Sequence, residues 1–383
     1  MILIIIIALL ILFYLDYQLG VYLTKKTNKS EQWLSYSDHI SIYTDGTSLY
    51  EQLCKDIEHA KHSIDIQFYI IRQDKISNRL YALLSQKQDE GVEVRFLTDW
   101  VGSFFFRKKW LQDRFAFKKA NRPKAPFFYH LQKRNHRKVV VIDKEIAYCG
   151  GFNLGDEYLG RDLHLGKWRD YHVRLTGDVA YLFHHVFTED WNKSKVVIPS
   201  PTLEGDLIRI VRNEGGSLEE SIVHLIRRAT NQIEIGSPYF IPTKRVLTEL
   251  FHALDRGVHV KIVIPEKADH LLTKAGALSF LTKMNNKGAQ IFLYMDGFFH
   301  GKVLFIDDHF CDIGTSNFDQ RSFRLNEELN MIVDNSHPIY QKMREVYDAD
   351  LVQCKEMTEQ WIRHQPLWMR LLGFISPLFR PFL

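Results

Sequence analysis

The chain has 383 residues, of which 45% are hydrophobic and 25% are charged, and this ordinary composition excludes a disordered or collagen-like chain. Its 50 Lys and Arg residues nearly balance its 46 Asp and Glu residues, so the net charge of +4 argues against a strongly basic nucleic-acid-binding protein. The four cysteines form no close pair, so neither a disulfide framework nor a zinc ribbon is expected.

The N-terminal segment predicts a membrane anchor. Residues 1–15 carry no charge, Asp16 follows them, and three lysines lie within residues 25–29. A helix of 15 residues spans about 22 Å, and extension to Leu23 gives about 35 Å, against roughly 30 Å for the hydrocarbon core of a bilayer. The basic residues follow the apolar run, unlike those of a secretory signal, and the positive-inside rule places them in the cytoplasm. We therefore expect a transmembrane helix and linker within residues 1–35, with a buried first strand or a cleaved signal as the alternatives.

The middle of the chain repeats itself. Residues 48–66 match residues 217–235 at an offset of 169, and GVEVRFLTD at 91–99 matches GVHVKIVIP at 257–265 at an offset of 166. The first pair of segments carries apolar residues at helical spacing, followed by an alternating strand. Alternating helices and strands predict an α/β fold with a mainly parallel or mixed sheet in each half, covered by helices.

The repeats define the expected domain organisation. The first repeat is expected at residues 36–200 and the second at 201–355, with a linker near residues 199–206. An amphipathic basic tail is expected at 356–383. Together with residues 1–35, these segments account for the whole chain.

Two further segments suggest contact with lipid. Residues 361–383 hold three Arg and no acid among Trp and Phe side chains, which is typical of a segment lying on an anionic membrane leaflet. A C-terminal helix docked on the core is the alternative. FFFRKKW at 104–110 combines apolar rings with cations and predicts either an interfacial lip or a buried helix start.

A third repeated block carries the chemistry. HRKVVVID at 136–143 matches HGKVLFID at 300–307, and GGFN at 150–153 matches GTSN at 314–317, both at an offset of 164. Residues two apart on a strand share one face, so each His projects beside a Lys from the start of an apolar strand. The two sets are His136, Lys138, Asp143 and Asn153 in the first half, and His300, Lys302, Asp307 and Asn317 in the second.

Such a pair of sets suits phosphodiester chemistry. Burying a His and a Lys together is costly without a ligand, and a Lys disfavours a neighbouring divalent cation, so phosphate is the better ligand. Ammonium and amide groups can hold the phosphoryl oxygens. One imidazole can attack phosphorus to form a phosphohistidine while the other protonates the departing alkoxide and later deprotonates the incoming hydroxyl. No Walker loop, dinucleotide fingerprint or metal-ligand cluster occurs in the sequence, so no cofactor and no metal are expected.

These blocks resemble the signatures of the phospholipase D superfamily, and within it the bacterial cardiolipin synthases. Residues 136–158 are similar to the first signature and residues 300–323 to the second. The resemblance extends over nearly all of residues 38–355. Supporting matches are FYIIRQD at 68–74, WRDYHVRLTG at 168–177, FTEDW at 187–191 and PYFIP at 238–242.

The resemblance implies two pseudo-symmetric repeats that share one active site. It makes His136 the nucleophile and His300 the general acid and base, although the two roles could be exchanged. The family also places an acid downstream of each His to orient its imidazole, which points to Asp170, 34 residues after His136, and to Glu328, 28 residues after His300. The phosphoryl-binding residues would be Lys138, Lys302, Asn153, Asn317 and Ser316, while Asp143 and Asp307 complete the catalytic motifs and are expected to brace their strands.

The resemblance further implies that the enzyme condenses two phosphatidylglycerol molecules into cardiolipin and glycerol. Phosphatidylglycerol and anionic membrane lipid are the expected partners, with no nucleic acid. The expected location is the cell membrane, with the catalytic part on the cytoplasmic side. The alternatives are a hydrolytic phospholipase D or phosphodiesterase, a nuclease of the same superfamily, and a non-catalytic membrane scaffold.

Overall fold

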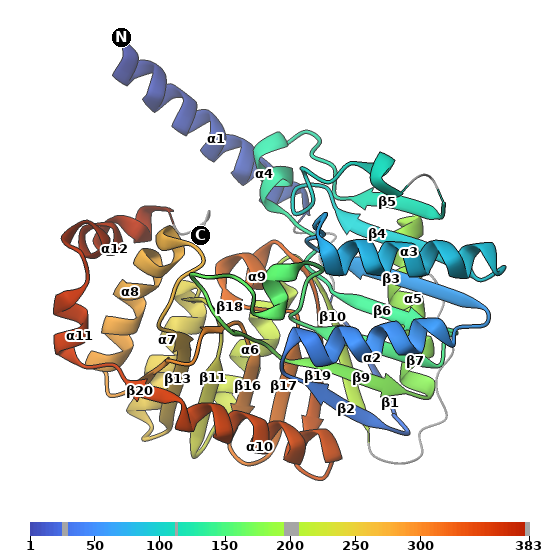
Figure 1. Ribbon diagram of the computed structural model, residues 1–383. Coiled ribbons are helices and arrows are strands. Elements are labelled where there is room, and N and C mark those ends of the chain that lie inside the picture. The colour runs from blue at the N-terminus through green and yellow to red at the C-terminus, as the bar shows by residue number, and fades with distance from the viewer. Residues whose placement is uncertain (25–29, 112–113, 195–206, 380–383) are drawn as a thin grey trace.

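The computed structural model describes residues 1–24, 30–111, 114–194 and 207–379, without the side chains of residues 2–4, 6–7 and 374–379. In Figure 1 the first half of the chain, blue to green, lies beside the second half, yellow to red. Each half is built on one large mixed sheet. The predicted linker at 199–206 lies outside the described residues, and the predicted domain boundaries stay a prediction.

The sheet of the first half has the strand order β2-β9-β7-β6-β3-β4-β5. Strands β3, β4 and β5 are parallel, and the remaining pairs are antiparallel. Its elements are β2 (Ile40–Tyr43), α2 (Gly46–Glu58), β3 (Ser63–Phe68), α3 (Lys75–Asp89), β4 (Glu93–Asp99), η1 (Lys108–Leu111), β5 (Ala116–Ala120), α4 (Phe127–Gln132), β6 (Val139–Ile142), β7 (Ile146–Gly150), η2 (Asp156–Leu159), β9 (His172–Thr176) and α5 (Asp178–Asn192).

The sheet of the second half repeats this order as β10-β19-β17-β16-β11-β13-β14, with β1 and β20 added at its edges. Strands β11, β13 and β14 are again parallel. Its elements are β1 (Ser30–Ser35), β10 (Ile208–Glu214), α6 (Ser217–Arg228), β11 (Gln232–Gly236), α7 (Lys244–Asp255), β13 (His259–Pro265), α8 (Leu271–Asn286), β14 (Gln290–Tyr294), β16 (Val303–Ile306), β17 (Phe310–Gly314), α9 (Gln320–Arg324), β19 (Glu327–Asp334), α10 (Pro338–Val352) and β20 (Cys354–Glu356). The α/β class with two repeats therefore fits the structure.

The two sheets share a central apolar core. Val139 and Val141 from β6 pack in one cluster with Phe305 from β16, Ile313 from β17 and Met331 from β19. All residues of β6 and β16 are buried, because both faces of these strands are covered. Each sheet also packs against its own helices through a separate apolar cluster. The halves are therefore joined by an apolar interface rather than by a linker alone.

The predicted N-terminal transmembrane helix is wrong. In the part of the chain that the structure describes, no helix is both long and apolar enough to cross a membrane. Residues Ile2–Thr24 do form a helix, α1, but its C-terminal half is docked on α4. Asp16 accepts a hydrogen bond from the backbone N–H of Tyr129 at 3.0 Å, and Thr24 Oγ1 lies 2.7 Å from the Tyr129 hydroxyl. The charge and the docking of this half explain why a count of apolar residues misled the prediction.

The C-terminal segment partly covers the core. Helix α12 (Leu367–Phe379) follows α11 (Glu359–His364) and packs against α8, where Met369 is buried. Leu367 and Trp368 on the same helix are exposed. The docked-helix alternative thus describes one face of α12, whereas Arg380 and the rest of residues 380–383 lie outside the described residues.

Candidate active site

The two histidines line one cavity of about 630 Å³ between the halves. Each is held by backbone pairing with the other half. The N–H of His136 donates to the carbonyl of Glu327 at 3.0 Å, and the N–H of His300 donates to the carbonyl of Arg169 at 2.6 Å. His300 directly follows β15 (Phe298–Phe299), which pairs with β8 (Trp168–Arg169) of the first half. The backbone of each repeat therefore positions the imidazole of the other.

The orienting acids are exchanged between the repeats. Nδ1 of His136 lies 3.1 Å from both carboxylate oxygens of Glu328, and Nδ1 of His300 contacts Oδ2 of Asp170. Both acids are completely buried. Asp170 lies two residues before His172, which pairs with Gly150 at the end of β7. Glu328 likewise lies two residues before Asn330, which pairs with Gly314 at the end of β17, so the two acids occupy equivalent positions in the repeats. The site consequently needs both halves.

A polar network holds Glu328 in place. Its carboxylate accepts hydrogen bonds from Thr315 Oγ1 at 2.6 Å, Ser322 Oγ at 2.9 Å and Asn326 Nδ2 at 3.3 Å. Burial favours the protonated acid, but the imidazole of His136, Lys138 and the Thr315 hydroxyl together lower the pKa of Glu328 below its ordinary value. An ionised Glu328 can fix the His136 tautomer and stabilise the imidazolium.

Asp170 has fewer neutral partners and one cation nearby. It accepts the backbone N–H of Tyr171 at 2.8 Å and lies 3.7 Å from the ammonium of Lys302. Burial opposes ionisation, but Lys302 and His300 hold the pKa of Asp170 below its ordinary value. A Cβ on Gly151, the second glycine of the GGFN segment, would lie only 2.0 Å from Asp170 Oδ1, so this glycine leaves space for the carboxylate.

The two motif lysines lie beneath the histidines. Lys138 Nζ donates to the carbonyl of His136 at 2.7 Å, and Lys302 Nζ donates to the carbonyl of His300 at 2.5 Å. Both are almost completely buried. Burial lowers the pKa of Lys138 to about 7 and also lowers the pKa of Lys302. An anion in the cavity would favour the charged forms of both lysines.

Burial shifts both imidazoles towards their neutral forms. Burial lowers the pKa of His136, against the opposing effect of Glu328. Burial and the neighbouring Lys302 lower the pKa of His300 to about 4. A neutral imidazole with Nδ1 held by a carboxylate leaves Nε2 available to attack or to accept a proton.

Three more predicted residues lie at or beside the cavity. Asn153 and Asn317 line it. Oδ1 of Asn153 accepts the N–H of Ile70 at 3.1 Å, and Nδ2 of Asn317 donates to Asp319 at 3.1 Å. Ser316 lines a small adjoining pocket that also reaches Lys302.

The two motif aspartates lie at the other end of their strands. Asp143 accepts backbone N–H groups from Lys61, His62 and Ser63 at 2.7–2.9 Å. Asp307 accepts those of residues 230–232 in the second half. Neither carboxylate lines the cavity. Each ties the end of a central strand to the turn before β3 or β11.

Comparisons with known proteins identify the family. A family model described as "Cardiolipin synthase, PLD-like domain" matches residues 53–191 and 222–351. The minor cardiolipin synthase ClsB of Bacillus subtilis is 36% identical over 339 residues, covering 84% of this chain and 84% of that protein. The chain belongs to the cardiolipin synthase family of phospholipase D-like proteins. The predicted family and the enzyme class, a phosphatidyltransferase of this superfamily, are thereby confirmed.

Other relatives extend the match over most of the chain. The cardiolipin synthase of Oceanobacillus iheyensis is 36% identical over 382 residues, covering 95% of this chain and 78% of that protein. Among solved structures, the phosphatidylserine synthase of Haemophilus influenzae superposes with a TM-score of 0.72 at 14% identity, covering 95% of this chain and 100% of that one. At this identity the superposition shows a shared fold.

Two arginines that no sequence motif indicated also line the cavity of this cardiolipin synthase family member. Arg134 is buried, pairs with Asp99 at 3.0 Å and lines the cavity together with Arg321. Arg134 lies two residues before His136, so the period of two that linked His136 to Lys138 could have revealed it. Nothing comparable marks Arg321 in the sequence.

Aromatic rings hold both imidazoles. The ring of Tyr69 packs against His136 with centres 5.0 Å apart. The centre of the Trp168 ring lies 5.0 Å from that of the His300 ring and 4.7 Å from that of the Tyr158 ring. Both Tyr69 and Trp168 belong to segments quoted for the family resemblance, but their positions next to the histidines could not be derived from spacing.

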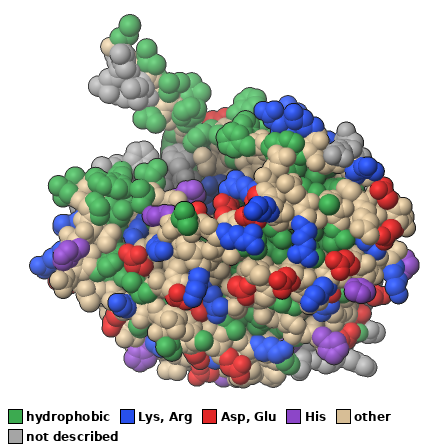
Figure 2. Space-filling view, viewed as in Figure 1, with side chains coloured by type: hydrophobic (Ala, Val, Ile, Leu, Met, Phe, Trp, Pro, Cys, Tyr) green, Lys and Arg blue, Asp and Glu red, His purple; other side chains and the backbone are tan. Residues whose placement is uncertain are grey.

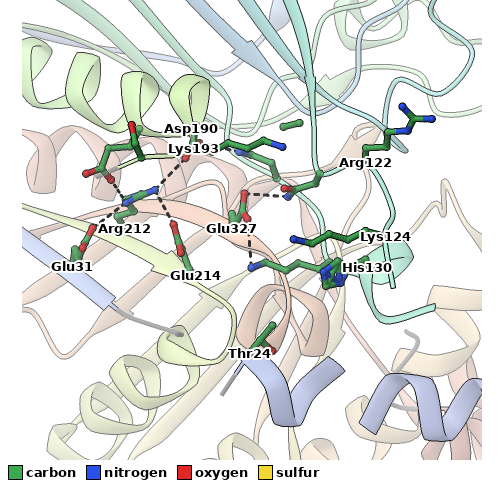
Figure 3. Close-up of a pocket in the computed structure, with 16 residues that line it drawn as sticks. Thr24, Glu31, Arg122, Lys124, His130, Asp190, Lys193, Arg212, Glu214 and Glu327 are labelled. Atoms are coloured by element: carbon green, nitrogen blue, oxygen red, sulfur yellow. Dashed lines mark hydrogen bonds and ion pairs between the residues drawn. The ribbon is translucent and has the colours of Figure 1, made fainter. Parts of the chain in front are cut away.

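A second cavity of about 730 Å³ adjoins the catalytic segments (Figure 3). Asn135 and Glu327, the chain neighbours of His136 and Glu328, line it. Lys124 extends towards Glu327 in Figure 3, and the ammonium of Lys133 lies 3.6 Å from the Glu327 carboxylate. Burial raises the pKa of Glu327. Among the described residues, no group of three His, Cys, Asp or Glu side chains could hold a metal ion.

Proposed function

We propose that the chain condenses two phosphatidylglycerol molecules into cardiolipin and glycerol through a phosphohistidine. The observation that carries the proposal is the crossed arrangement of His136–Glu328 and His300–Asp170 around one cavity. Two oriented imidazoles, with buried cations beside them, match the needs of a two-step phosphoryl transfer. The relatives are named as cardiolipin synthases, which supports cardiolipin as the product.

In the first step, Nε2 of His136 attacks phosphorus of the donor lipid. The N–P bond forms as the P–O bond to glycerol breaks, and His300 gives its proton to the departing alkoxide. Lys138 and Lys302 neutralise the charge on the non-bridging oxygens, and Asn153 and Asn317 donate to these oxygens. The anionic phosphodiester also counteracts the effect of Lys302 on His300, which increases the fraction of imidazolium available as the acid.

In the second step, a hydroxyl of another phosphatidylglycerol attacks the phosphohistidine. His300, now neutral, takes the proton of this hydroxyl as the new P–O bond forms and the N–P bond breaks. The step returns His136 to its neutral form and His300 to its protonated form. Glu328 and Asp170 hold the tautomers of the two histidines unchanged through the cycle. Ser316, in the pocket that reaches Lys302, assists in binding the phosphoryl group.

Association with the surface of the cell membrane is part of the proposal. Phe105 of the predicted lip is 83% exposed, and the exposed Leu271 and Leu272 also line the catalytic cavity. Apolar side chains gather along α1 and over α12 in Figure 2. Exposed apolar side chains at the mouth of the cavity suit lipid headgroups presented by a membrane. The cytoplasmic placement of the catalytic part stays a prediction.

The proposal is tested with purified full chain in mixed micelles containing phosphatidylglycerol with a labelled phosphate. We expect labelled cardiolipin and an equimolar amount of glycerol, with turnover abolished in His136→Ala and His300→Ala. Phosphatidic acid without cardiolipin would instead identify a hydrolase. Cleavage of DNA but not of lipid would identify a nuclease, and a protein inactive on both would be a scaffold.

A further inference from the structure

One wall of the catalytic cavity carries a carboxylate that the proposed steps do not use. Asp269, in the loop before α8, lines the cavity beside Tyr239. The Tyr239 hydroxyl donates a hydrogen bond to Oδ2 of Asp269. Oδ1 of Asp269 is shielded from solvent and accepts no hydrogen bond from the residues that the structure describes. The Asp269 side chain is 17% exposed, so a ligand in the cavity can donate to this carboxylate when the side chain turns Oδ1 into the opening.

The Asp269 side chain does not cap the helix that begins just after it. It precedes His270, the residue that caps α8, and no backbone N–H at the start of this helix donates to its carboxylate in the described structure. His270 is largely exposed and its Nε2 lies 3.9 Å from Asp269, too far for a hydrogen bond. The Tyr239 hydroxyl instead fixes the carboxylate along the cavity wall.

This wall belongs to the His300 side of the cavity. From His300 the lining runs through Trp168 and Tyr158 to Tyr239 and Asp269. The negative charge of Asp269 also acts on the His300 imidazole, where it opposes the lowering of the pKa caused by burial and by Lys302. Asp269 is thus within electrostatic reach of the imidazole assigned to handle the alcohol proton.

The charge selects the chemistry of the ligand. Lys138, Lys302 and Arg134 are cations near the two histidines, whereas a carboxylate disfavours direct contact with a phosphate oxygen. Alcohol hydroxyls, in contrast, donate well to a carboxylate. A glycerol headgroup has two neighbouring hydroxyls, so that one can bind Asp269 while the other faces His300.

We propose that Asp269, held by Tyr239, binds the diol of the phosphatidylglycerol headgroup and thereby selects glycerol-bearing lipid as leaving group and as acceptor. This inference rests on the proposed function, because it names the residue that recognises the alcohol in that reaction. Asp269 is a binding residue for the alcohol, while His300 transfers the proton.

The test measures how the phosphohistidine divides between competing alcohols. Full-length enzyme in micelles of labelled phosphatidylglycerol is supplied with glycerol and 1-propanol, and the labelled products of transfer to each alcohol and to water are counted. We expect the wild type to prefer glycerol, and Asp269→Asn to lower the glycerol-to-propanol ratio at least tenfold while still cleaving the donor lipid. Tyr239→Phe, which frees the carboxylate without removing it, should lower the ratio at least threefold.

Asp255→Asn provides a matched control, because Asp255 is an exposed aspartate at the end of α7 that pairs with Lys287. It should leave the ratio unchanged. A glycerol-to-propanol ratio within twofold of wild type in Asp269→Asn overturns the inference. If that variant does not fold, as judged by circular dichroism, an unchanged ratio in Tyr239→Phe overturns it instead. Failure of the wild type to form cardiolipin would refute the proposed function, and is a separate outcome.

Discussion

Exchanging the orienting carboxylates for amides should separate the roles of the two histidines. Glu328→Gln and Asp170→Asn keep the shape of each side chain and remove its charge. Glu328 receives hydrogen bonds from Thr315, Ser322 and Asn326 besides its contact with His136, so the new amide NH₂ must face at least one donor. The loss of a charge-assisted hydrogen bond costs about 1.5–3 kcal/mol, and an unsatisfied buried group adds about 1–3 kcal/mol.

These terms sum to about 4 kcal/mol, which corresponds to roughly a 10³-fold lower kcat, since about 1.4 kcal/mol is tenfold in rate. Removing the acid also removes the effect that opposes burial at His136, so its pKa should fall further. The equivalent amide substitution in the Ser-His-Asp triad costs about 10⁴-fold, roughly ten times the loss expected here.

The assay uses a phosphatidyl ester of 4-nitrophenol, whose leaving group departs without a proton. If His136 is the nucleophile, Asp170→Asn should recover a near wild-type burst of nitrophenolate, because its defect lies at the acid, while Glu328→Gln should stay slow. Recovery by Glu328→Gln alone would exchange the two roles. Equal recovery, or none in either variant, would refute the division of labour between nucleophile and acid.

Three further predictions concern charge and space around the site. Because the pKa of Lys138 is lowered to about 7, its ammonium is lost from the free enzyme as the pH rises through that value, and kcat/KM for phosphatidylglycerol micelles should fall tenfold per unit at higher pH; a flat profile to pH 9 would contradict its phosphate-binding role. Burial raises the pKa of Asp312 from 3.8 to about 7, so stability from its protonated form is complete below pH 3.8 and is lost as the pH rises through 7. At pH 9, the free energy of unfolding measured by urea denaturation should therefore be higher for Asp312→Asn than for wild type, by up to about 4 kcal/mol. At pH 4 the two values should differ little. Gly151→Ala should lower kcat at least 100-fold with a small change in melting temperature, because its Cβ would meet the Asp170 carboxylate at 2.0 Å; wild-type turnover would show that Asp170 can move freely.

Much of the architecture follows from internal comparison of the sequence. Three repeated blocks in constant order predict two α/β halves, and the observed strand orders repeat one another element by element. The spacing of His136 to Lys138 and of His300 to Lys302 predicts side chains on one face, and the structure brings the two histidines to one cavity. The catalytic roles of these residues stay predictions.

Other features depend on contacts that no spacing contains. Sequence distance relates Glu328 to His300, yet its carboxylate contacts His136, because the loop before β6 pairs with β19 of the other half. Hydropathy identifies the apolar run of α1 but cannot foresee that Asp16 binds the backbone of Tyr129. Asp269 belongs to no repeated block, and only the fold brings it to the cavity wall.

Each carboxylate orients the histidine of the other half, and this exchange makes catalysis depend on how the two halves are placed. A half that supplied both a histidine and its own carboxylate could retain a working imidazole when separated from the other half. Here each half supplies the histidine and lysine of one set and the carboxylate of the other, so a shift between the two sheets displaces both His136–Glu328 and His300–Asp170 at once. The apolar interface containing Val139, Phe305 and Met331 therefore holds the reacting groups in register, although none of these three side chains lines the cavity.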